Sequence, residues 1–217
     1  MKTIAVIQAR LGSTRLPNKV LLPLAGKSMV HNVFERVSRA KKIDYAVIAW
    51  PTDYDCDEND LVKRLLLCAQ QHRAYRIIRV CSDCPCVEPR EIDAVANYSP
   101  LKGKYMPVTV LSTAEDTKRN HDGFGGELYT VQQLEWMDKT IKDALYREHP
   151  HKFWIALRSY QYVGKKYSKG FRLDVNTQEN YEKLRDIYDH FGHNHFTVKE
   201  VIEYLEQKNL AERNISP

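Results

Sequence analysis

Apolar and polar positions alternate in two different ways along the first hundred or so residues. Short continuous apolar runs are typical of strands buried on both faces of a sheet, and each is followed by apolar residues at helical spacing. Ser28 is a candidate cap for the first helix, and Pro89 is well placed as the first residue of the third. The predicted strands are 4–7, 45–50 and 77–81, and the predicted helices are 30–37, 61–68 and 89–96. This βαβαβα order predicts an α/β fold with a mostly parallel sheet, which binds ligands beyond the carboxyl ends of its strands.

The second half of the chain has a less regular pattern. Apolar residues share one helix face over 181–191 up to Gly192, and Thr197 with Glu200 forms a capping box before another such face. The chain has no repeat at a fixed distance and no Gly-rich or Pro-rich linker. We therefore expect one domain over 1–217, with the C-terminal helices, at about 178–209, packed on it. The other predicted elements are strands at 128–131 and 171–175 and a helix at 134–145.

The composition is that of a chain with a buried core. Of the 217 residues, 43% are hydrophobic and 28% are charged, and no stretch approaches the roughly 18 consecutive apolar residues of a membrane span. The opening apolar run at 4–7 stops at Gln8, short of the core of a secretory signal. Five cysteines are an odd number in a chain without an export signal, so we expect the reducing cytoplasm and no disulfide scaffold.

The net charge of +5 is unevenly distributed along the chain. Residues 1–42 contain nine Lys and Arg against a single acid, Glu35, a net +8, so the remainder is net −3. This asymmetry indicates an anionic ligand, and either a polyphosphate or a nucleic acid would satisfy it.

The loop after the first predicted strand, residues 8–19, has the parts of a phosphate-binding site. Gly12 lets the backbone approach an anion closely, and N–H groups in such a turn can cradle phosphate oxygens. Arg10, Arg15 and Lys19 can neutralise the charge that grows on a departing pyrophosphate. The spacing is neither that of a Walker A loop nor that of the dinucleotide motif G-x-G-x-x-G.

Residues 8–24 read Q-A-R-L-G-S-T-R-L-P-N-K-V-L-L-P-L, which resembles the signature loop of the cytidylyltransferases that activate sugars. The likeness is greatest to the spore-coat polysaccharide type, a relative of the enzymes that activate sialic and ketodeoxyoctonic acids. Further stretches resemble the family in the same order along nearly the whole chain. These stretches are Arg79-Val80-Cys81-Ser82-Asp83-Cys84-Pro85, Glu88-Pro89 with Ile92-Asp93, His121-Asp122-Gly123 with Glu127, Tyr146-Arg147-Glu148-His149, and 172–181.

The resemblance implies a three-layer α/β/α fold of the nucleotide-diphospho-sugar transferase (Rossmann-like) kind. It implies a Mg²⁺-dependent cytidylyltransferase that joins CMP from CTP to a sugar or sugar-like acid with release of pyrophosphate, for surface polysaccharide or glycan biosynthesis. The partners that it implies are CTP, the acceptor and a second copy of the chain in a homodimer, without nucleic acid or membrane.

The resemblance also implies roles for residues at matching positions. Arg10, Arg15 and Lys19 would hold the triphosphate and, with Asp83, form the catalytic set. Asp83 would hold Mg²⁺, a hard cation that prefers carboxylate oxygen and lowers the cost of charge in an in-line displacement at phosphorus. The nucleotide-binding residues would be Gln8, Ala9, Arg10, Leu11, Gly12, Ser13, Lys19 and Asp83. The acceptor would meet Asp122, Glu127, Arg147, Glu148 and His149.

Three features depart from the family pattern. The second acidic metal ligand falls at Asn176, whose amide supplies an oxygen but no charge. Asp174, two residues earlier on the same face of a strand, is a further candidate ligand, with pairing to a neighbouring cation as the alternative. Ser82 replaces a Gly and narrows the approach of the backbone. The chain is also shortened between about 53 and 61.

Two other clusters have simpler interpretations. The acidic stretch 53–60 lacks the Gly and Glu of an EF-hand loop, which favours a solvated turn with a helix-capping Asp. Cys81, Cys84 and Cys86 have no second C-x-x-C or well-spaced His pair to complete a zinc site, which favours buried, small apolar roles.

Three competing functions remain open from the sequence. A glycosyltransferase of the same fold would use a D-x-D motif, for which Asp53-x-Asp55 and Asp55-x-Asp57 fit the letters. A catalytically impaired, nucleotide-binding descendant of the family would bind CTP with little dependence on Mg²⁺, a hypothesis prompted by Asn176 and Ser82. Nucleic-acid binding ranks last, because no aromatic platform accompanies the cations of the loop.

Overall fold

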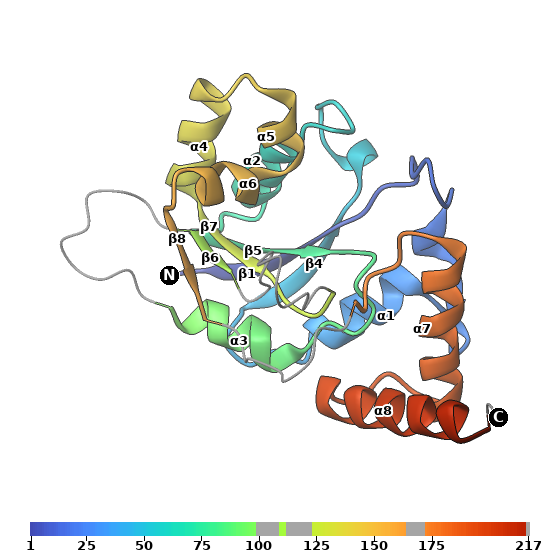
Figure 1. Ribbon diagram of the computed structural model, residues 1–217. Helices are drawn as coiled ribbons and strands as arrows, with labels where there is room; N and C mark the ends of the chain where they lie inside the picture. Colours follow the sequence, from blue (N-terminus) through green and yellow to red (C-terminus); the bar gives the residue numbers. More distant parts are fainter. Residues whose placement is uncertain (99–108, 112–122, 164–171, 216–217) are drawn as a thin grey trace.

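The computed structural model describes residues 1–98, 109–111, 123–163 and 172–215 (Figure 1). Its strands are β1 (Thr3–Gln8), β4 (Tyr45–Ala49), β5 (Arg76–Cys81), β6 (Thr109–Leu111), β7 (Glu127–Thr130) and β8 (Tyr160–Tyr162). They form one sheet in the order β4-β1-β5-β7-β6-β8. β1 is parallel to β4 and β5, and β6 is parallel to β8, whereas β7 is antiparallel to β5 and β6. The α/β class with a mostly parallel sheet is confirmed.

Helices cover both faces of this sheet, because successive residues of a strand point to opposite sides. The covering helices are α1 (Met29–Val37), α2 (Leu61–Gln71), α3 (Pro89–Asn97), α4 (Val131–Thr140) and α6 (Pro150–Ala156). Ala5 and Ile7 of β1 belong to a core with α1 and α3, while Ile4 and Val6 belong to a core with α2, α4 and α6. Figure 1 shows these helices in layers on either side of the strands. The predicted three-layer arrangement is therefore confirmed.

Two C-terminal helices, α7 (Gln178–Phe191) and α8 (Val198–Ile215), form a third core beside α1 (Figure 1). α7 ends where Gly192 adopts a φ of +70°, a conformation that glycine favours. α8 begins with the predicted capping box, in which Glu200 N donates to Thr197 Oγ1 at 3.2 Å and Thr197 N donates to Glu200 Oε2 at 2.7 Å. α7 lies within the predicted C-terminal segment, and α8 begins in it but extends beyond its predicted end, to Ile215.

The structure departs from the predicted elements in the second half of the chain. The predicted helix at 134–145 is two helices, because the chain extends at Ile141 and α5 (Ala144–Glu148) begins anew with Asp143 as its cap. The predicted strand at 171–175 is wrong for the described residues 172–175, which have no regular structure beyond a single bridge at Arg172. Their apolar alternation has another cause, since Leu173 and Val175 are buried against α7 and α8.

Several short elements were not predicted from the sequence. They include β6, β8, α5 and α6. They also include the hairpin of β2 (Pro23–Leu24) and β3 (Lys27–Ser28) and the 3-10 turns η1 (Lys19–Leu21) and η2 (Pro51–Asp53). Among the described residues, there is no helix with both the length and the apolar character needed to cross a membrane.

Candidate active site

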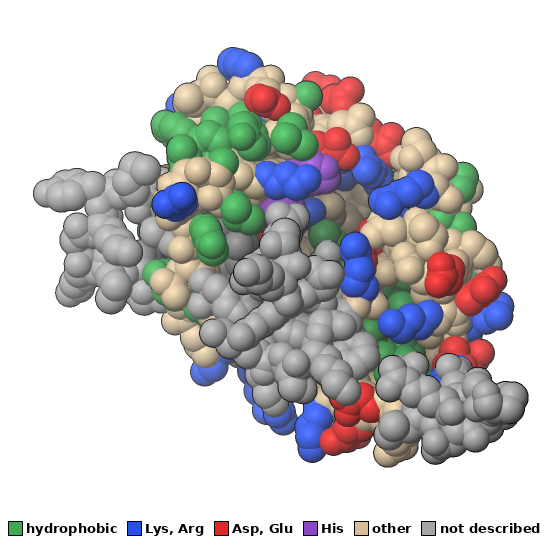
Figure 2. Space-filling view, in the orientation of Figure 1, with side chains coloured by type: hydrophobic (Ala, Val, Ile, Leu, Met, Phe, Trp, Pro, Cys, Tyr) green, Lys and Arg blue, Asp and Glu red, His purple; other side chains and the backbone are tan. Residues whose placement is uncertain are grey.

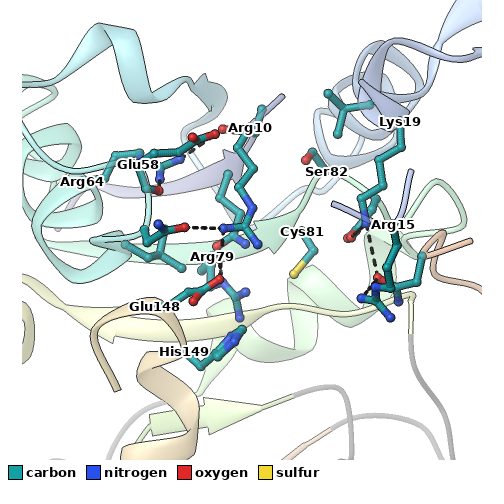
Figure 3. Close-up of a pocket in the computed structure, with 17 residues that line it drawn as sticks. Arg10, Arg15, Lys19, Glu58, Arg64, Arg79, Cys81, Ser82, Glu148 and His149 are labelled. Carbon is teal, nitrogen blue, oxygen red and sulfur yellow. Dashed lines mark hydrogen bonds and ion pairs between the residues drawn. The ribbon is translucent and has the colours of Figure 1, made fainter. Parts of the chain in front are cut away.

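A cavity of about 210 Å³ opens where the carboxyl ends of β1 and β5 meet (Figure 3). The loop after β1 supplies Arg10, Arg15 and Lys19, and the end of β5 supplies Arg79 and Asp83. The remaining wall comes from the start of α2, the end of α5 and the segment before α7. Because β1 and β5 are parallel neighbours, both loops leave the sheet at the same end. The cavity thus lies where the βαβ pattern predicts a ligand site.

Basic side chains outnumber acidic ones around the cavity. Figure 2 shows Lys and Arg side chains gathered around the hollow, and in Figure 3 Arg10 and Arg79 lie across it from Arg15 and Lys19. The lining cations are Arg10, Arg15, Lys19, Arg64 and Arg79, and the lining carboxylates are Glu58, Asp83 and Glu148. Such an excess of positive charge in a cavity favours a polyanionic ligand such as a triphosphate.

Lys19 is the point where three segments of the chain meet. Its Nζ donates to Asp83 Oδ2 at 2.6 Å, to the Val175 carbonyl oxygen at 2.6 Å and to Asn176 Oδ1 at 3.3 Å. Arg15 Nη2 donates to the same Asn176 oxygen at 2.9 Å. Three oxygens from distant parts of the sequence therefore converge on a single cation.

Asn176 presents its amide oxygen to the cavity because its nitrogen is held from behind. Asn176 Nδ2 donates to Asp174 Oδ2, and the Asp174 carboxylate also accepts from Arg172 Nε at 3.1 Å and Nη2 at 2.9 Å. Asp174 therefore lies beside the Asn176 amide, as predicted, but it also pairs with a neighbouring cation and does not line the cavity. Its visible effect is to orient Asn176.

The acidic turn before α2 contacts the phosphate loop. Glu58 Oε1 accepts a hydrogen bond from Gly12 N at 3.3 Å, and Asn59 Oδ1 accepts one from Arg10 Nη1 at 2.8 Å. The turn is exposed and Asp60 caps α2, both as predicted. The contacts with the loop were not predicted, although the position of the turn after β4 was a signal, since β4 and β1 are parallel neighbours.

Arg64 is a site residue that the sequence analysis missed. It lies inside α2, is only 3% exposed, and donates to the carbonyl oxygens of Ala9, at 3.1 Å, and Glu58. Its Nε has no hydrogen-bond partner among the residues that the structure describes. A charged residue next to Leu65, on the apolar face of a predicted helix, was the signal that could have identified it.

A buried ion pair fixes Arg79 at the back of the cavity. Its Nη1 pairs with Glu127 Oε1 and its Nε donates to Gln8 Oε1 at 2.6 Å, while Tyr129 Oη donates to Glu127 Oε2 at 2.7 Å. Burial raises the pKa of Glu127, but the charges of Arg79 and His151 outweigh it and hold that pKa below its usual value. Glu127 itself does not line the cavity, so the structure places this predicted acceptor residue behind Arg79.

The other predicted acceptor residues divide into two groups. Glu148 and His149 line the cavity, and Glu148 Oε1 lies 3.0 Å from Arg10 Nη1. Burial and the nearby charge of Lys152 lower the pKa of His149, which favours its neutral imidazole. Arg147 does not line the cavity. Asp122 lies outside the described residues.

The guanidinium of Arg147 joins three helices on the far side of α5. It pairs with Asp60, the cap of α2, at 2.6 Å and with Asp138 of α4 at 2.7 Å, and it donates to the Ile141 carbonyl oxygen at 2.9 Å. The Arg147 side chain therefore links α5 to α2 and α4.

The predicted nucleotide-binding residues are likewise divided. Gln8, Ala9, Arg10, Lys19 and Asp83 line the cavity. The remaining three, Leu11, Gly12 and Ser13, do not line it, although Gly12 N donates to Glu58, which does.

The cysteines near Asp83 have different surroundings. Cys86 belongs to the core of α7 and α8, as predicted for a small apolar residue, and Cys84 is also buried. Cys81 lines the cavity instead, and in Figure 3 its sulfur lies near the centre of the view. Among the described residues, Cys81 Sγ, an Asp83 carboxylate oxygen and Cys84 Sγ lie within 4.8 Å of one another.

Comparison with known sequences finds a matching family model and similar proteins. A family model described as cytidylyltransferase matches residues 4–69. Uncharacterized protein MJ1063 of Methanocaldococcus jannaschii is 27% identical, over 100% of this chain and 95% of its own length. The 3-deoxy-manno-octulosonate cytidylyltransferase of Bartonella quintana is 29% identical, over 86% of this chain and 85% of its own length.

Solved structures of the same kind share the fold. A cytidylyltransferase from Leptospira borgpetersenii is similar over 96% of this chain and 95% of its own, with a TM-score of 0.84 and 23% identity. A CMP:2-keto-3-deoxy-manno-octonic acid synthetase complexed with CTP is similar over 88% of this chain and 99% of its own, with a TM-score of 0.61 and 16% identity. The three-layer arrangement of helices on both faces of the sheet is thus the fold that this chain shares with these proteins.

Proposed function

Because the chain belongs to the cytidylyltransferase family of nucleotidyltransferase enzymes, we propose that it joins the CMP part of CTP to a sugar or sugar-like acid and releases pyrophosphate. The observation that carries the proposal is the cavity at the ends of β1 and β5, where the loop cations Arg10, Arg15 and Lys19 meet the carboxylate of Asp83. The relatives that are named for a sugar acid support this class of acceptor.

The loop cations are proposed to bind the triphosphate and to stabilise its reaction. Arg10 and Arg15 lie on opposite sides of the cavity, so they can hold different phosphates of one chain (Figure 3). Lys19 donates to phosphate oxygens and offsets the charge that grows on the leaving pyrophosphate. The backbones of Ala9 and Gly12 and the side chains of Gln8, Leu11 and Ser13 complete the predicted nucleotide site.

The residues around Lys19 fit a divalent cation such as Mg²⁺. The ammonium of Lys19 is a cation held by a carboxylate, a carbonyl and an amide oxygen, and these hard donors are the ones that Mg²⁺ prefers. Asp83 would hold the ion with Asn176, while Asp174 would act through Asn176 or as a further ligand. When bound, Mg²⁺ neutralises phosphate charge during the displacement.

Glu148 and His149 are proposed to face the acceptor. The neutral imidazole of His149 can accept a hydrogen bond or a proton from an attacking hydroxyl, and Glu148 is held in place by Arg10. Asp122 stays a predicted acceptor residue. Glu127 and Arg147 are proposed to support the acceptor site without lining the cavity. Glu127 fixes Arg79, and Arg147 positions α5.

The test is pyrophosphate release with each of the four ribonucleoside triphosphates and Mg²⁺, across a panel of sugar acids and sugar phosphates. We expect release with CTP and a sugar acid, and a loss of at least about a hundredfold in Asp83→Ala, a typical cost of removing electrostatic stabilisation of a transition state. Asp189→Ala removes an exposed carboxylate of α7 and is the matched control.

Two results would contradict the proposal. CTP binding that is independent of Mg²⁺, with no release across the panel, would favour a binding protein descended from an enzyme. Release of a nucleoside diphosphate from a nucleotide sugar would favour the glycosyltransferase alternative.

We also propose a homodimer, acting in the cytoplasm in surface polysaccharide or glycan biosynthesis. Exposed apolar side chains support a second copy as partner: Figure 2 shows hydrophobic side chains gathered on one part of the surface, and the exposed large apolar residues include Trp136, Leu145, Leu157 and Tyr160. Light scattering of the purified protein measures its mass in solution, and a monomer at all concentrations would contradict the homodimer.

A further inference from the structure

Two thiols stand at the ends of the turn that carries Asp83. Cys84 N donates to the Cys81 carbonyl oxygen at 3.3 Å, which closes a four-residue turn after β5. A turn of this kind brings its first and last Cα atoms within about 7 Å, and a disulfide spans roughly 4.4 to 6.8 Å between Cα atoms. The two sulfurs already lie within 4.8 Å of each other. The turn therefore holds the two cysteines close enough for a bond to form once the turn tightens.

The two thiols differ in access to solvent. Cys81 is half-buried and lines the cavity, whereas Cys84 is only 7% exposed and its Sγ lies 3.7 Å from Asp83 Oδ1. Cys81 is therefore the sulfur that a small oxidant entering the cavity can reach. An accessible thiol with a second thiol beside it is the arrangement typical of redox-sensing cysteines.

We propose that Cys81 and Cys84 form a reversible disulfide that switches off the site around Asp83. A hydroperoxide oxidises the Cys81 thiol to a sulfenic acid and is itself reduced to the alcohol or water. The Cys84 sulfur then attacks the Cys81 sulfur, the S–S bond forms, and the sulfenic oxygen leaves as water. A dithiol reductant returns both thiols and is oxidised to its own disulfide.

The bond would disturb Asp83 because Asp83 lies between the two cysteines. The sulfurs must approach from up to 4.8 Å to about 2.05 Å, which tightens the turn and removes the Cys84 thiol as a donor to Asp83. Asp83 is joined through Oδ2 to Lys19 and through its carbonyl oxygen to Val175 N, so the movement reaches both walls of the cavity. This effect on turnover rests on the proposed function, whereas the disulfide itself does not.

The experiment oxidises the full chain with hydrogen peroxide in the presence of EDTA, blocks remaining thiols with iodoacetamide, and maps them by mass spectrometry. We expect the peptide with Cys81 and Cys84 to have lost two hydrogens and both of these cysteines to take up no label, while Cys86 in the same peptide is labelled. We also expect turnover to fall at least about tenfold, since displacement of a positioning group by 1 Å can cost up to about a hundredfold. Dithiothreitol should restore both the label and the turnover.

Two variants serve as matched tests. Cys84→Ser keeps a hydroxyl that can donate to Asp83 but cannot form the bond, so we expect basal turnover and, on oxidation, an added oxygen on Cys81 in place of the cross-link. Cys56→Ser removes another half-buried thiol, one outside the cavity lining, and should cross-link like the original chain.

The mass measurement separates failure of this proposal from failure of the proposed function. Oxidation that adds oxygen to Cys81 while Cys84 still takes up label overturns the disulfide, whether or not turnover is found. A cross-link that leaves both turnover and CTP affinity unchanged overturns the switch. A cross-link in a chain without turnover, with weakened CTP binding, keeps the switch and rejects only the transferase.

Discussion

Asn176 determines how much charge the cavity offers a metal ion. Its Oδ1 accepts from Arg15 and Lys19, and its Nδ2 is tied to Asp174, so the amide is held in one orientation by groups on both sides. An amide supplies an oxygen without a negative charge, which leaves Asp83 as the carboxylate that lines this part of the cavity. Metal affinity should therefore be limited by residue 176.

Asn176→Asp is expected to lower the Mg²⁺ concentration needed for half-maximal turnover by about tenfold. The reason is a second charge beside Asp83, which at a separation of about 4 Å contributes on the order of 1 kcal/mol or more to the binding of a cation. The measurement is initial rate against Mg²⁺ concentration at saturating CTP.

Gln178→Glu is the control for Asn176→Asp, because it adds the same charge two residues away, at an exposed position outside the cavity lining. An equal shift in both variants would mean that the general field, and not a ligand at position 176, sets the Mg²⁺ requirement.

The site residues that could be predicted from the sequence are those that lie next to each other in the chain or follow a strand. Arg10 and Lys19 were found because they lie in a phosphate-binding pattern after a strand, and Asp83 was found because its segment resembles that of a known family. Glu58 and Arg64 were missed because their roles depend on contacts with a loop some fifty residues away. No local pattern encodes such a contact, and only the parallel register of β1 and β4 points to it.

Arg147 links the short helix α5 to α2 and α4. A helix of five residues has little stability of its own, so its place depends on such contacts. Because α5 leads directly into Glu148 and His149, the ion pairs of Arg147 determine where these two side chains enter the cavity. Of three consecutive residues, Arg147 therefore links helices, while Glu148 and His149 line the cavity.

Arg147→Met is expected to lower the free energy of unfolding by about 1–2 kcal/mol, between the values typical of exposed and buried ion pairs. Turnover should fall as well, because Glu148 and His149 lose their fixed position. Chemical denaturation and steady-state kinetics measure the two effects. Lys142→Met removes an exposed cation just before α5 as the control. Unchanged stability in Arg147→Met would show that α5 is held by its apolar contacts alone.

The segment before β7 packs against the backbone before α7 at a single glycine. Gly123 has a φ of +99°, and a Cβ there would lie 2.4 Å from the Leu173 carbonyl carbon and 2.5 Å from Asp174 N. Since Asp174 orients Asn176, this contact also supports the cavity from behind.

Gly123→Ala is expected to lower the free energy of unfolding by about 2–4 kcal/mol, because both the backbone conformation and the space exclude a side chain. Gly26→Ala is the matched control: Gly26 also has a positive φ, +78°, but nothing lies within 4 Å of its added Cβ. We expect about 1 kcal/mol there, the cost of the conformation alone. Equal losses in thermal or chemical unfolding would contradict the role of the close contact.

The molecule as a whole is more predictable in its first half than in its second. Strands buried on both faces produce continuous apolar runs, so β1, β4 and β5 with their helices could be predicted. Residues 172–175 alternate like a strand, yet Leu173 and Val175 are buried against α7 and α8 without strand pairing. Apolar periodicity reports burial, and it identifies a strand only where a neighbouring strand supplies hydrogen bonds.

The basic N-terminal segment also divides into two roles. Arg10, Arg15 and Lys19 line the cavity, but Arg36 is fully buried and donates to the carbonyl oxygens of Val87 and Asn194. Part of the charge that indicated an anionic ligand therefore fastens α1 to the turn between α7 and α8.

Glu35 of α1 also contacts the turn between α7 and α8, and its contribution to stability depends on pH. Its carboxylate accepts from Lys27 Nζ at 2.5 Å and from Asn194 Nδ2 at 2.6 Å. The hydrogen bond from Lys27 is the main cause that lowers the pKa of Glu35 to about 2, against the opposing effect of burial. Because the folded pKa lies below the unfolded value of about 4.5, folding favours the ionised form. The stabilisation is complete above about pH 4.5 and is lost as the pH falls towards 2.

We therefore expect the thermal midpoint of Glu35→Gln to lie below that of the original chain at pH 7, and the gap between the two to narrow as the pH falls from about 4.5 towards 3. The midpoint is measured by circular dichroism across this range. Asp189→Asn, an exposed carboxylate on α7, is the control and should show a small gap at every pH. A gap for Glu35→Gln that stays constant down to pH 3 would mean that the carboxylate acts through its shape and hydrogen bonds, with no contribution from its charge.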